Sequence, residues 1–453
     1  MIIHMNMTFL LLLCIELSES LYCFSASKSH VLNNRRWLPT TFAAASYSSS
    51  DQEDVNATGG LYASLRSRQR QVAAEKAFLL SGWRKGRCSS RVAVVLEDDW
   101  VRRCDFSGRL IALGTASGNV HVVDVQKGVT QLVTRSEGAV SAHKRYAEKA
   151  QDLSLLHGSF DGGGVTALAL NGNILATGGR EGDLKLWRAI RHGKPQLEFT
   201  QLCGSDQNVV SAVAVLDATV IAGCLDGSLR LLRRTRLETD KDEDTAQESG
   251  CWSTDWFIES VAHSDQTNSS VAILCLAATI QDESNEEIIV CGCSDGTVKF
   301  FRDGVRLSQL DWQPFPTSST RSLTLAPPYI YAGSSDGALK RRRIDIGHLV
   351  YDQNTYEESL FPNHSGSIVS LVHREGILCS GSTDGTIRIW DLKPRSDKSP
   401  PSVCYGFGGF KVWLGSLACD EKILLSDGSD NTIICHDFSS PPPKPTTNNG
   451  DNT

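Results

Sequence analysis

The sequence predicts an all-β fold: a seven-bladed β-propeller closed by an N-terminal strand, with a short N-terminal helix and disordered tails. One phrase carries the prediction: a short apolar strand, a turn of small residues and a second strand of alternating character. It recurs seven times. Successive turn glycines such as Gly182 and Gly227, 45 residues apart, or Gly296 and Gly337, 41 residues apart, match the roughly 40–45-residue period of a four-stranded blade.

The seven copies lie in order along residues 91–439, which we take as the propeller. They are LIALGTASGNVHVVD (110–124), ILATGGREGDLKLWR (174–188), VIAGCLDGSLRLLRR (220–234), IIVCGCSDGTVKFFR (288–302), YIYAGSSDGALKRRR (329–343), ILCSGSTDGTIRIWD (377–391) and ILLSDGSDNTIICHD (423–437). Most are preceded by another short apolar segment, such as 165–170 or 368–373. Each copy is therefore read as the middle of a blade whose faces are buried by the neighbouring blades.

The turn in each copy has a physical reason. Asp-Gly and Asn-Gly tolerate the positive φ that a tight hairpin needs, as at Asp384-Gly385. The alternation that follows, from Thr386 to Trp390, is typical of a strand.

Residues 91–96 (RVAVVL) form a strand that has no copy of its own. An open propeller would leave unpaired strand edges. We therefore expect this strand to join the last copy, at 411–437, and to close the ring.

At this point the residues resemble the WD-repeat (WD40) family. The best copy spans 364–391, and the resemblance implies that His364, Ser380, Asp384 and Trp390 form a hydrogen-bonded structural tetrad inside one blade. In the copy at 174–188, Glu181 stands in for the turn Asp, and the copy ending at 343 lacks the Trp. Those blades are expected to rely more on apolar packing.

Residues 51–90 form a linker in which the spacing of apolar residues over 61–88 predicts a basic amphipathic helix. The run around Trp83, Arg84, Gly86 and Arg87 resembles, more weakly, the approach to the propeller in F-box/WD proteins. No F-box is visible upstream of it.

The first 50 residues are expected to be a targeting presequence or a disordered tail. An eight-residue apolar run, 8–15, precedes a segment, 24–50, that lacks Asp and Glu and is rich in Ser. This order resembles the bipartite presequence of algae with secondary plastids, which predicts a plastid location. The alternative is a disordered tail without a targeting role, on a cytoplasmic or nuclear protein. Residues 440–453 are expected to be a second disordered tail.

Composition limits the partners. The net charge of −7 argues against a generally basic nucleic-acid binder, and no span in the mature part is long and apolar enough for a membrane. We expect a monomeric propeller that works within a complex of other proteins, which offer it acidic segments.

No constellation of catalytic residues is recognised, so the protein is not expected to be an enzyme. Most of the cysteines lie in apolar runs and are read as buried small residues. Cys291 and Cys293 form a CxC motif, but no second Cys/His pair at zinc spacing follows. We expect no metal site and no cofactor.

Two insertions interrupt the repeat, at 129–161 and 236–268. The first is expected to contain a short helix. The second is acidic and then aromatic, and Trp252, Trp256 and Phe257 form a candidate docking segment. Alternatively, these aromatic residues begin the outer strand of the next blade or pack on the ring.

The third strand of several copies ends in positive charge. These residues form a candidate basic interaction rim: Arg188, Arg191, Arg233, Arg234, Arg236, Arg302, Arg306, Arg341, Arg342 and Arg343. The alternative is that they are ordinary solvated strand ends.

The sequence therefore predicts a non-catalytic protein-interaction scaffold. The alternative is a substrate-recognition adaptor of a ubiquitin ligase, which rests on the F-box/WD likeness alone.

Overall fold

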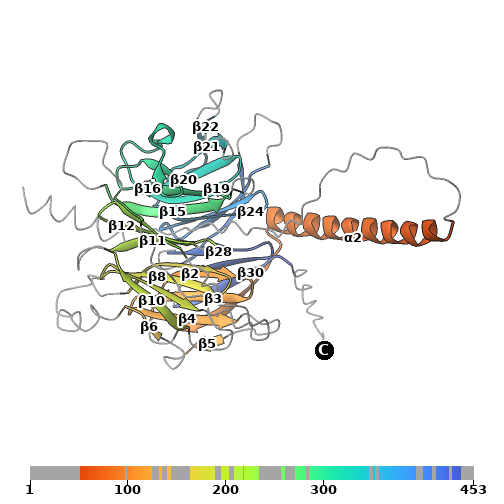
Figure 1. Cartoon of the computed structure of the whole chain (residues 1–453), viewed down its shortest axis with the longest axis horizontal. Coiled ribbons are helices and arrows are strands. Elements are labelled where there is room, and N and C mark those ends of the chain that lie inside the picture. The colour runs from red at the N-terminus through yellow and green to blue at the C-terminus, as the bar shows by residue number, and fades with distance from the viewer. Residues whose placement is uncertain are drawn as a thin grey trace, which may run out of the picture.

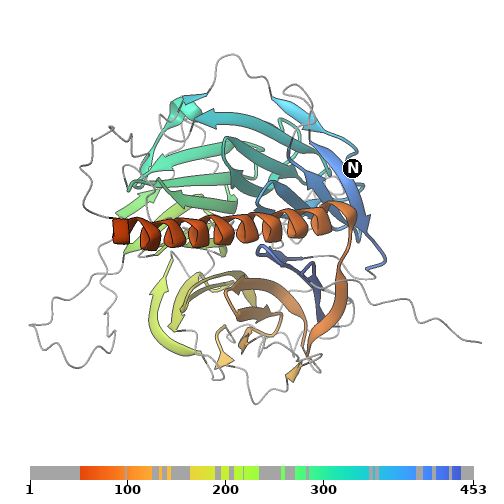
Figure 2. The same cartoon turned by 90° about the vertical axis from the view of Figure 1, so that its right-hand side faces the viewer.

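The computed structural model describes residues 52–96, 99–124, 132–134, 140–143, 164–188, 195–203, 209–217, 219–233, 257–260, 271–281, 285–345, 350–351, 357–393, 401–410, 415–427 and 431–439. The presequence, the tail 440–453 and most of both insertions lie outside them. In the described part, the strands form seven separate sheets, each built from antiparallel strands, and the sheets are arranged as a ring (Figures 1 and 2). The prediction of a seven-bladed propeller is confirmed.

Each blade has four antiparallel strands. The inner strands are β2 (Val101–Ser107), β7 (Val165–Asn171), β11 (Val210–Val215), β15 (Ile273–Ile280), β19 (Thr320–Ala326), β24 (Ile368–Arg374) and β28 (Leu417–Cys419). The second strands are β3 (Leu110–Thr115), β8 (Ile174–Gly179), β12 (Thr219–Cys224), β16 (Glu287–Cys293), β20 (Tyr329–Ser334), β25 (Ile377–Ser382) and β29 (Ile423–Asp427).

The third strands are β4 (Asn119–Asp124), β9 (Asp183–Arg188), β13 (Ser228–Arg233), β17 (Val298–Arg302), β21 (Leu339–Asp345), β26 (Ile387–Asp391) and β30 (Thr432–Asp437). The outer strands are β6 (Val140–Ser141), β10 (Gln196–Leu202), β14 (Phe257–Ser260), β18 (Val305–Arg306), β23 (Glu358–Leu360), β27 (Ser402–Phe407) and β1 (Ser89–Leu96). We number the blades 1 to 7 by their inner strands, from β2 to β28. The short strand β22 (Val350–Tyr351) extends blade 5, and a 3₁₀ turn η3 (Ser308–Leu310) follows β18.

The turns between second and third strands have the backbone that the sequence predicts. Gly385 has a φ of +75° and Gly182 a φ of +80°, and Asn431 takes the same role in blade 7 with a φ of +59°. Only glycine, or a residue such as Asn, adopts this region at low cost.

Glycines in the second strands let neighbouring blades approach closely. A Cβ placed on Gly178 would come within 2.4 Å of the side chain of Val210, on the inner strand of the next blade. The same relation holds between Gly223 and Ile273. A larger residue at these positions would push the blades apart.

Side-chain hydrogen bonds join the inner strands of successive blades around the whole ring. Thr166 of blade 2 donates to the carbonyl of Val210 in blade 3, and Ser322 of blade 5 donates to the carbonyl of Ile368 in blade 6. The complete set is Arg103 to Thr166, Thr166 to Val210, Ser211 to Ile273, Cys275 to Thr320, Ser322 to Ile368, Leu417 to Ser370 and Ser416 to Cys104. We call this set the inner belt. Because each bond is buried, losing one partner would leave an unsatisfied polar group.

Blade 7 is built from both ends of the ring. β1 pairs antiparallel with β30, from Ser89 opposite Asp437 to Val95 opposite Thr432. Its Val94 is 1% exposed. A further strand, β5 (Leu132–Thr134), adds to the free edge of β1 in parallel and covers it. The closure predicted from residues 91–96 is confirmed.

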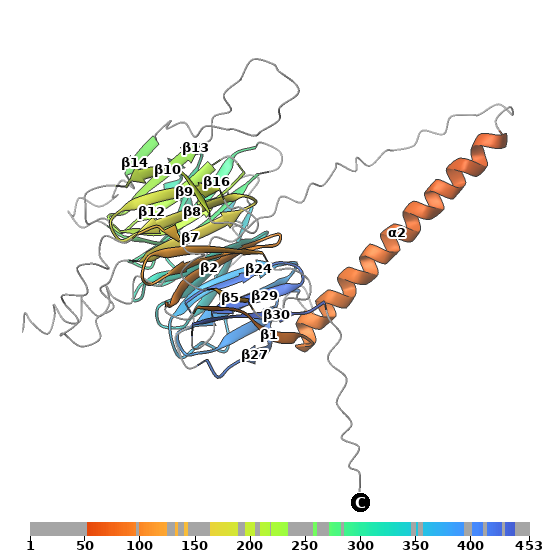
Figure 3. The ribbon, with the colours of Figure 1, turned by 90° about the horizontal axis from the view of Figure 1, so that it is seen from below.

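The helix before the ring is longer than the sequence predicts. α2 runs from Gln52 to Lys85, 34 residues, or about 50 Å at 1.5 Å per residue. Figure 3 shows that its C-terminal end lies near β27 and β30 and that the helix extends away from the blades. Among the described residues, no helix is both long and apolar enough to cross a membrane.

Deleting residues 91–96 should open the ring. The deletion removes most of β1 and exposes the edge of β30, so we expect a large loss of thermal stability and aggregation. Thermal melting with light scattering measures both. A melting curve like that of the intact chain would show that β1 does not hold the ring closed.

Candidate functional site

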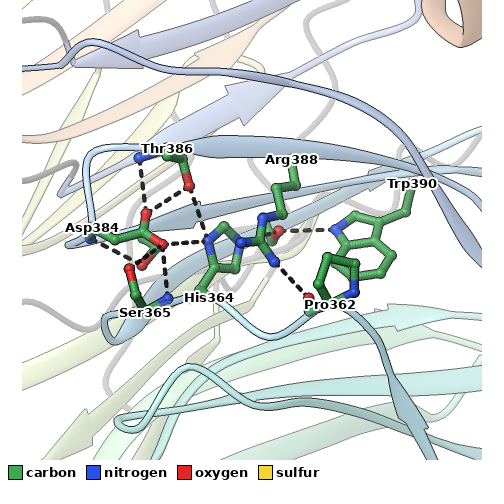
Figure 4. A network of polar contacts seen from close by, with 9 residues as sticks. Pro362, His364, Ser365, Asp384, Thr386, Arg388 and Trp390 are labelled. Carbon is green, nitrogen blue, oxygen red and sulfur yellow. Dashed lines mark hydrogen bonds and ion pairs between the residues drawn. The ribbon is translucent and has the colours of Figure 1, made fainter.

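Blade 6 contains a buried chain of polar side chains that links three of its segments (Figure 4). Trp390 donates its indole N–H to the hydroxyl of Ser380 at 2.9 Å, and that hydroxyl lies 2.8 Å from Nε2 of His364. The other ring nitrogen, Nδ1, lies 3.1 Å from Oδ2 of Asp384 and 3.1 Å from the hydroxyl of Thr386. The four residues singled out in the sequence therefore lie together.

The direction of these bonds fixes the protonation of the histidine. Because the carboxylate of Asp384 can only accept, Nδ1 of His364 carries the proton and donates to it, and the unprotonated Nε2 accepts from the hydroxyl of Ser380. Burial, and then the charge of Arg388, lower the pKa of His364 to about 4. Burial alone would raise the pKa of Asp384, but hydrogen bonds from Thr386, Ser365 and His364 outweigh it and lower that pKa to about 2. The pair is a neutral imidazole and a carboxylate at neutral pH.

Blade 2 has a second set of the same kind, which the sequence reasoning missed. Trp187 donates to the hydroxyl of Thr177 at 2.9 Å, and that hydroxyl lies 3.1 Å from Nε2 of His143. Nδ1 of His143 lies 2.7 Å from Oδ1 of Asp183. Burial raises the pKa of Asp183, but the contacts with His143 and Lys185 outweigh it, so the pKa is lowered.

The carboxylate in blade 2 is not the residue expected from the turn. The sequence suggested that Glu181 replaces the turn Asp, but Glu181 approaches Nδ1 of His143 only to 3.8 Å. Asp183, two residues later, occupies the position that Thr386 has in blade 6, because both lie six residues after the hydroxyl residue. The signal that could have found this set is the Thr177-to-Trp187 spacing, which equals the Ser380-to-Trp390 spacing.

Comparison of the sequence with known protein families also identifies a WD repeat in this chain. The family model described as "WD domain, G-beta repeat" matches residues 356–391, the segment that contains the blade 6 tetrad.

This chain is a seven-bladed β-propeller that contains a WD repeat.

Two curated relatives are similar to parts of this WD-repeat protein. "THO complex subunit 6" of Drosophila melanogaster is 26% identical over 28% of this chain and 36% of its own length. "WD repeat-containing protein 55 homolog" of Dictyostelium discoideum is 26% identical over 24% of this chain and 26% of its own length. The chain thus spans about a third or less of these relatives, and neither name denotes an enzyme.

Among solved structures, the "WD40 beta propeller domain of Doa1" is 14% identical, with a TM-score of 0.49, and the alignment covers 77% of this chain and 97% of that one.

The base of α2 is fixed to the WD-repeat ring at blades 6 and 7. Trp83 is 4% exposed, stacks on the ring of Phe438 at 3.8 Å and donates its indole N–H to the carbonyl of Glu421 at 2.9 Å. Arg84 forms an ion pair of 2.8 Å with Asp391. One turn earlier, Leu79 is buried, and Lys76 reaches Glu375 at 3.0 Å.

The rest of α2 carries exposed apolar and basic residues. Apolar side chains of α2 stay uncovered by the ring: Val72 is 48% exposed, and Phe78, on another face of the helix, is 46% exposed. Arg66, Arg68 and Arg70 are also exposed. The helix is therefore anchored by its last three turns and exposes residues 66–74 to solvent.

The candidate basic rim is paired with acidic residues where it is described. Arg188 pairs with Glu198 at 2.7 Å, and Arg341, 5% exposed, pairs with Glu358 at 2.6 Å. The remaining described ion pairs of the rim are Arg233 with Glu287 and with Asp303, Arg302 with Glu286 and Arg306 with Asp311. Arg342 and Arg343 continue β21. These pairs offset much of the positive charge that the sequence suggested for this edge.

Three rim arginines and two docking aromatics lie outside the described residues: Arg191, Arg234, Arg236, Trp252 and Trp256. Phe257 begins β14 and pairs with Leu231 of β13. Phe257 thus starts the outer strand of blade 3, the blade that precedes the insertion. The alternative interpretation predicted an outer strand here, but placed it in the next blade. The described part of the first insertion contributes strands, β5 and β6, and the short helix expected there also lies outside.

Replacing Asp183 with Asn should destabilise the protein more than replacing Glu181 with Gln. Only Asp183 receives the hydrogen bond from His143, so we expect a loss of about 1–3 kcal/mol for the first variant and little change for the second in metal-free buffer. Urea unfolding of both variants measures the difference. Equal losses would contradict the assignment of Asp183.

The stability of the fold should depend on pH through two kinds of buried group, histidines with a lowered pKa and an aspartate with a raised pKa, whose effects on stability are opposite. Burial lowers the pKa of His364, His373 and His436 to about 4, against 6.5 in an unfolded chain, so the stability they confer is lost as pH falls from 6.5 to 4. Burial raises the pKa of Asp427 to about 7, against 3.8, so this residue stabilises the fold increasingly as pH falls from 7.

An Asp427→Asn variant isolates the second effect. Between about pH 8 and pH 5, the melting temperature of the wild type should rise relative to that of the variant. Folded wild type takes up a proton on Asp427 in this range, whereas the histidines contribute equally to both proteins. Parallel melting curves across the range measure it. A constant difference between the two proteins would contradict the raised pKa.

Proposed function

We propose that this WD-repeat protein is a non-catalytic scaffold on which other proteins assemble, and that α2 is one of its docking elements. The observation that carries the proposal is the helix itself. It is fixed at its base by Trp83 and extends into solvent with Val72 and Phe78 exposed.

Physical chemistry supports a partner for this helix. Isolated helices derive little stability in water from propensity alone, and most helical stability in proteins comes from packing of one face. Among the α2 residues whose side chains the structure describes, only those of the last turns obtain such packing from the ring. A partner that covers Val72 would supply it to the middle of the helix.

The charge of the helix indicates the chemistry of that partner. Arg66, Arg68 and Arg70 are followed by a single acidic residue, Glu75, before the anchored turns. A partner with an acidic and partly apolar surface would be attracted to this segment. This agrees with the expectation that partners offer acidic segments.

The adaptor of a ubiquitin ligase is the second candidate. Its support is the weaker F-box/WD likeness at Trp83–Arg87, together with the place of that segment. In those proteins the equivalent segment joins F-box helices to the propeller, and here it ends a long helix that meets the ring at its closure.

The cellular location stays a prediction. The presequence proposal rests on residues 1–50, which lie outside the described part of the chain. Plastid neighbours of the protein in its native cell would support the organellar scaffold. Neighbours from the ubiquitin-ligase machinery would support the adaptor instead.

Proximity labelling in the native cell, with the label at the carboxyl terminus, tests the docking role of α2. We expect the double variant Val72→Gln and Phe78→Gln to lose neighbours that the wild type labels, because Gln keeps helix propensity and removes the apolar contact. The matched control is Val305→Gln, which removes another exposed apolar residue (59%) from β18 on blade 4. If the double variant labels the same set as the control, α2 is not a docking element.

A further inference from the structure

The junction of blades 1 and 2 brings together three side chains that can each offer a metal ligand. Nδ1 of His143 and carboxylate oxygens of Glu181 and Asp183 all lie within 4.8 Å of one another. His143 follows β6 of blade 1, whereas both acidic residues belong to the turn and strand that follow β8 in blade 2. The cluster therefore spans two blades.

Glu181 is the unexplained member of this cluster. It is 8% exposed, and neither of its carboxylate oxygens has a hydrogen-bond partner among the described residues. The neighbouring donors are engaged elsewhere: Nδ1 of His143 is 2.7 Å from Asp183, and the ammonium group of Lys185 contacts Asp183 and the carbonyl of Ala142. A buried carboxylate without a partner is costly unless a cation compensates for it.

The three ligand atoms converge on one small volume beside Gly179. A Cβ at residue 179 would lie 2.3 Å from Nδ1 of His143, 2.5 Å from Oδ1 of Asp183 and 2.6 Å from Oε2 of Glu181. Any other residue would push these atoms apart. The absence of a side chain at this position keeps the three donors directed at a common space.

The surrounding contacts orient the donors as second-layer contacts do in metal sites. The hydroxyl of Thr177 holds the other nitrogen of His143, and Lys185 holds the other oxygen of Asp183 at 3.0 Å. Blade 6 lacks this arrangement: its histidine faces one carboxylate, Asp384, and a hydroxyl, Thr386. Of the two tetrads described here, the one in blade 2 pairs two carboxylates with its histidine.

We propose that His143, Glu181 and Asp183 bind one divalent ion of the zinc type and so tie blade 1 to blade 2. One imidazole nitrogen and two carboxylate oxygens leave a fourth position for water, as in zinc sites with three protein ligands. On binding, the proton of His143 moves from Nδ1 to Nε2, which then donates to Thr177. This differs from the expectation of no metal site, because no pattern in the sequence places His143 beside residues 181–183.

Cobalt(II) titration of the metal-free full chain tests the proposal. We expect one ion per chain to bind saturably and to give visible d–d bands without the near-ultraviolet charge-transfer band of thiolate ligands, so that binding by cysteines is recognised. Zinc should raise the melting temperature of the same protein.

Glu181→Gln is the decisive variant, because Glu181 makes none of the tetrad hydrogen bonds and its loss should leave the fold intact. We expect its cobalt affinity to fall at least about tenfold and its melting temperature to stay the same when zinc is added. The matched control, Glu198→Gln, removes a carboxylate from β10 of the same blade and should bind like the wild type.

Three outcomes would overturn the proposal: no saturable binding, a thiolate band, or unchanged affinity in Glu181→Gln.

Discussion

The inner belt of hydrogen bonds is the constraint on which the rest of the structure depends. A blade of this protein buries both faces against other blades, so its stability depends on how closely the neighbouring inner strands approach. Glycines such as Gly178 and Gly223 allow that approach, and hydroxyls such as Thr166 and Ser211 join the strands once they are close. The loss of one blade would therefore leave buried polar groups without partners on both sides.

The closing junction differs from the other six, and the helix is fixed beside it. At the glycine position of the second strand, blade 7 has Asp427, which accepts hydrogen bonds from the backbone of Gly415 and Ser416. On the same blade, Trp83 packs on Phe438 and β1 follows α2 directly. The segment that closes the ring thus also fixes the direction of α2, and a partner bound to α2 would act on the blade whose closure holds the ring together.

The two tetrads show how far the sequence could locate a site. In blade 6, His364, Ser380, Asp384 and Trp390 stand at the spacing of the family, so they could be named from the sequence. In blade 2 the strand residues Thr177 and Trp187 keep that spacing, but His143 is separated from them by a long insertion and the carboxylate comes from Asp183. Nothing in the order of residues 140–183 indicates which histidine returns to the blade or which of two acidic residues meets it.

The sequence by itself determined the ring. Strand alternation, Asp-Gly turns and a repeat of about 40–45 residues are local properties, and seven copies with one spare strand leave closure as the way to bury the edges. The tertiary structure decided what lies between distant segments: the ion pairs that offset the rim arginines, the place of Trp83 on Phe438, and the convergence of His143, Glu181 and Asp183 beside Gly179. These contacts join residues of different blades or of opposite chain ends, so they depend on how the blades pack and not on any local pattern.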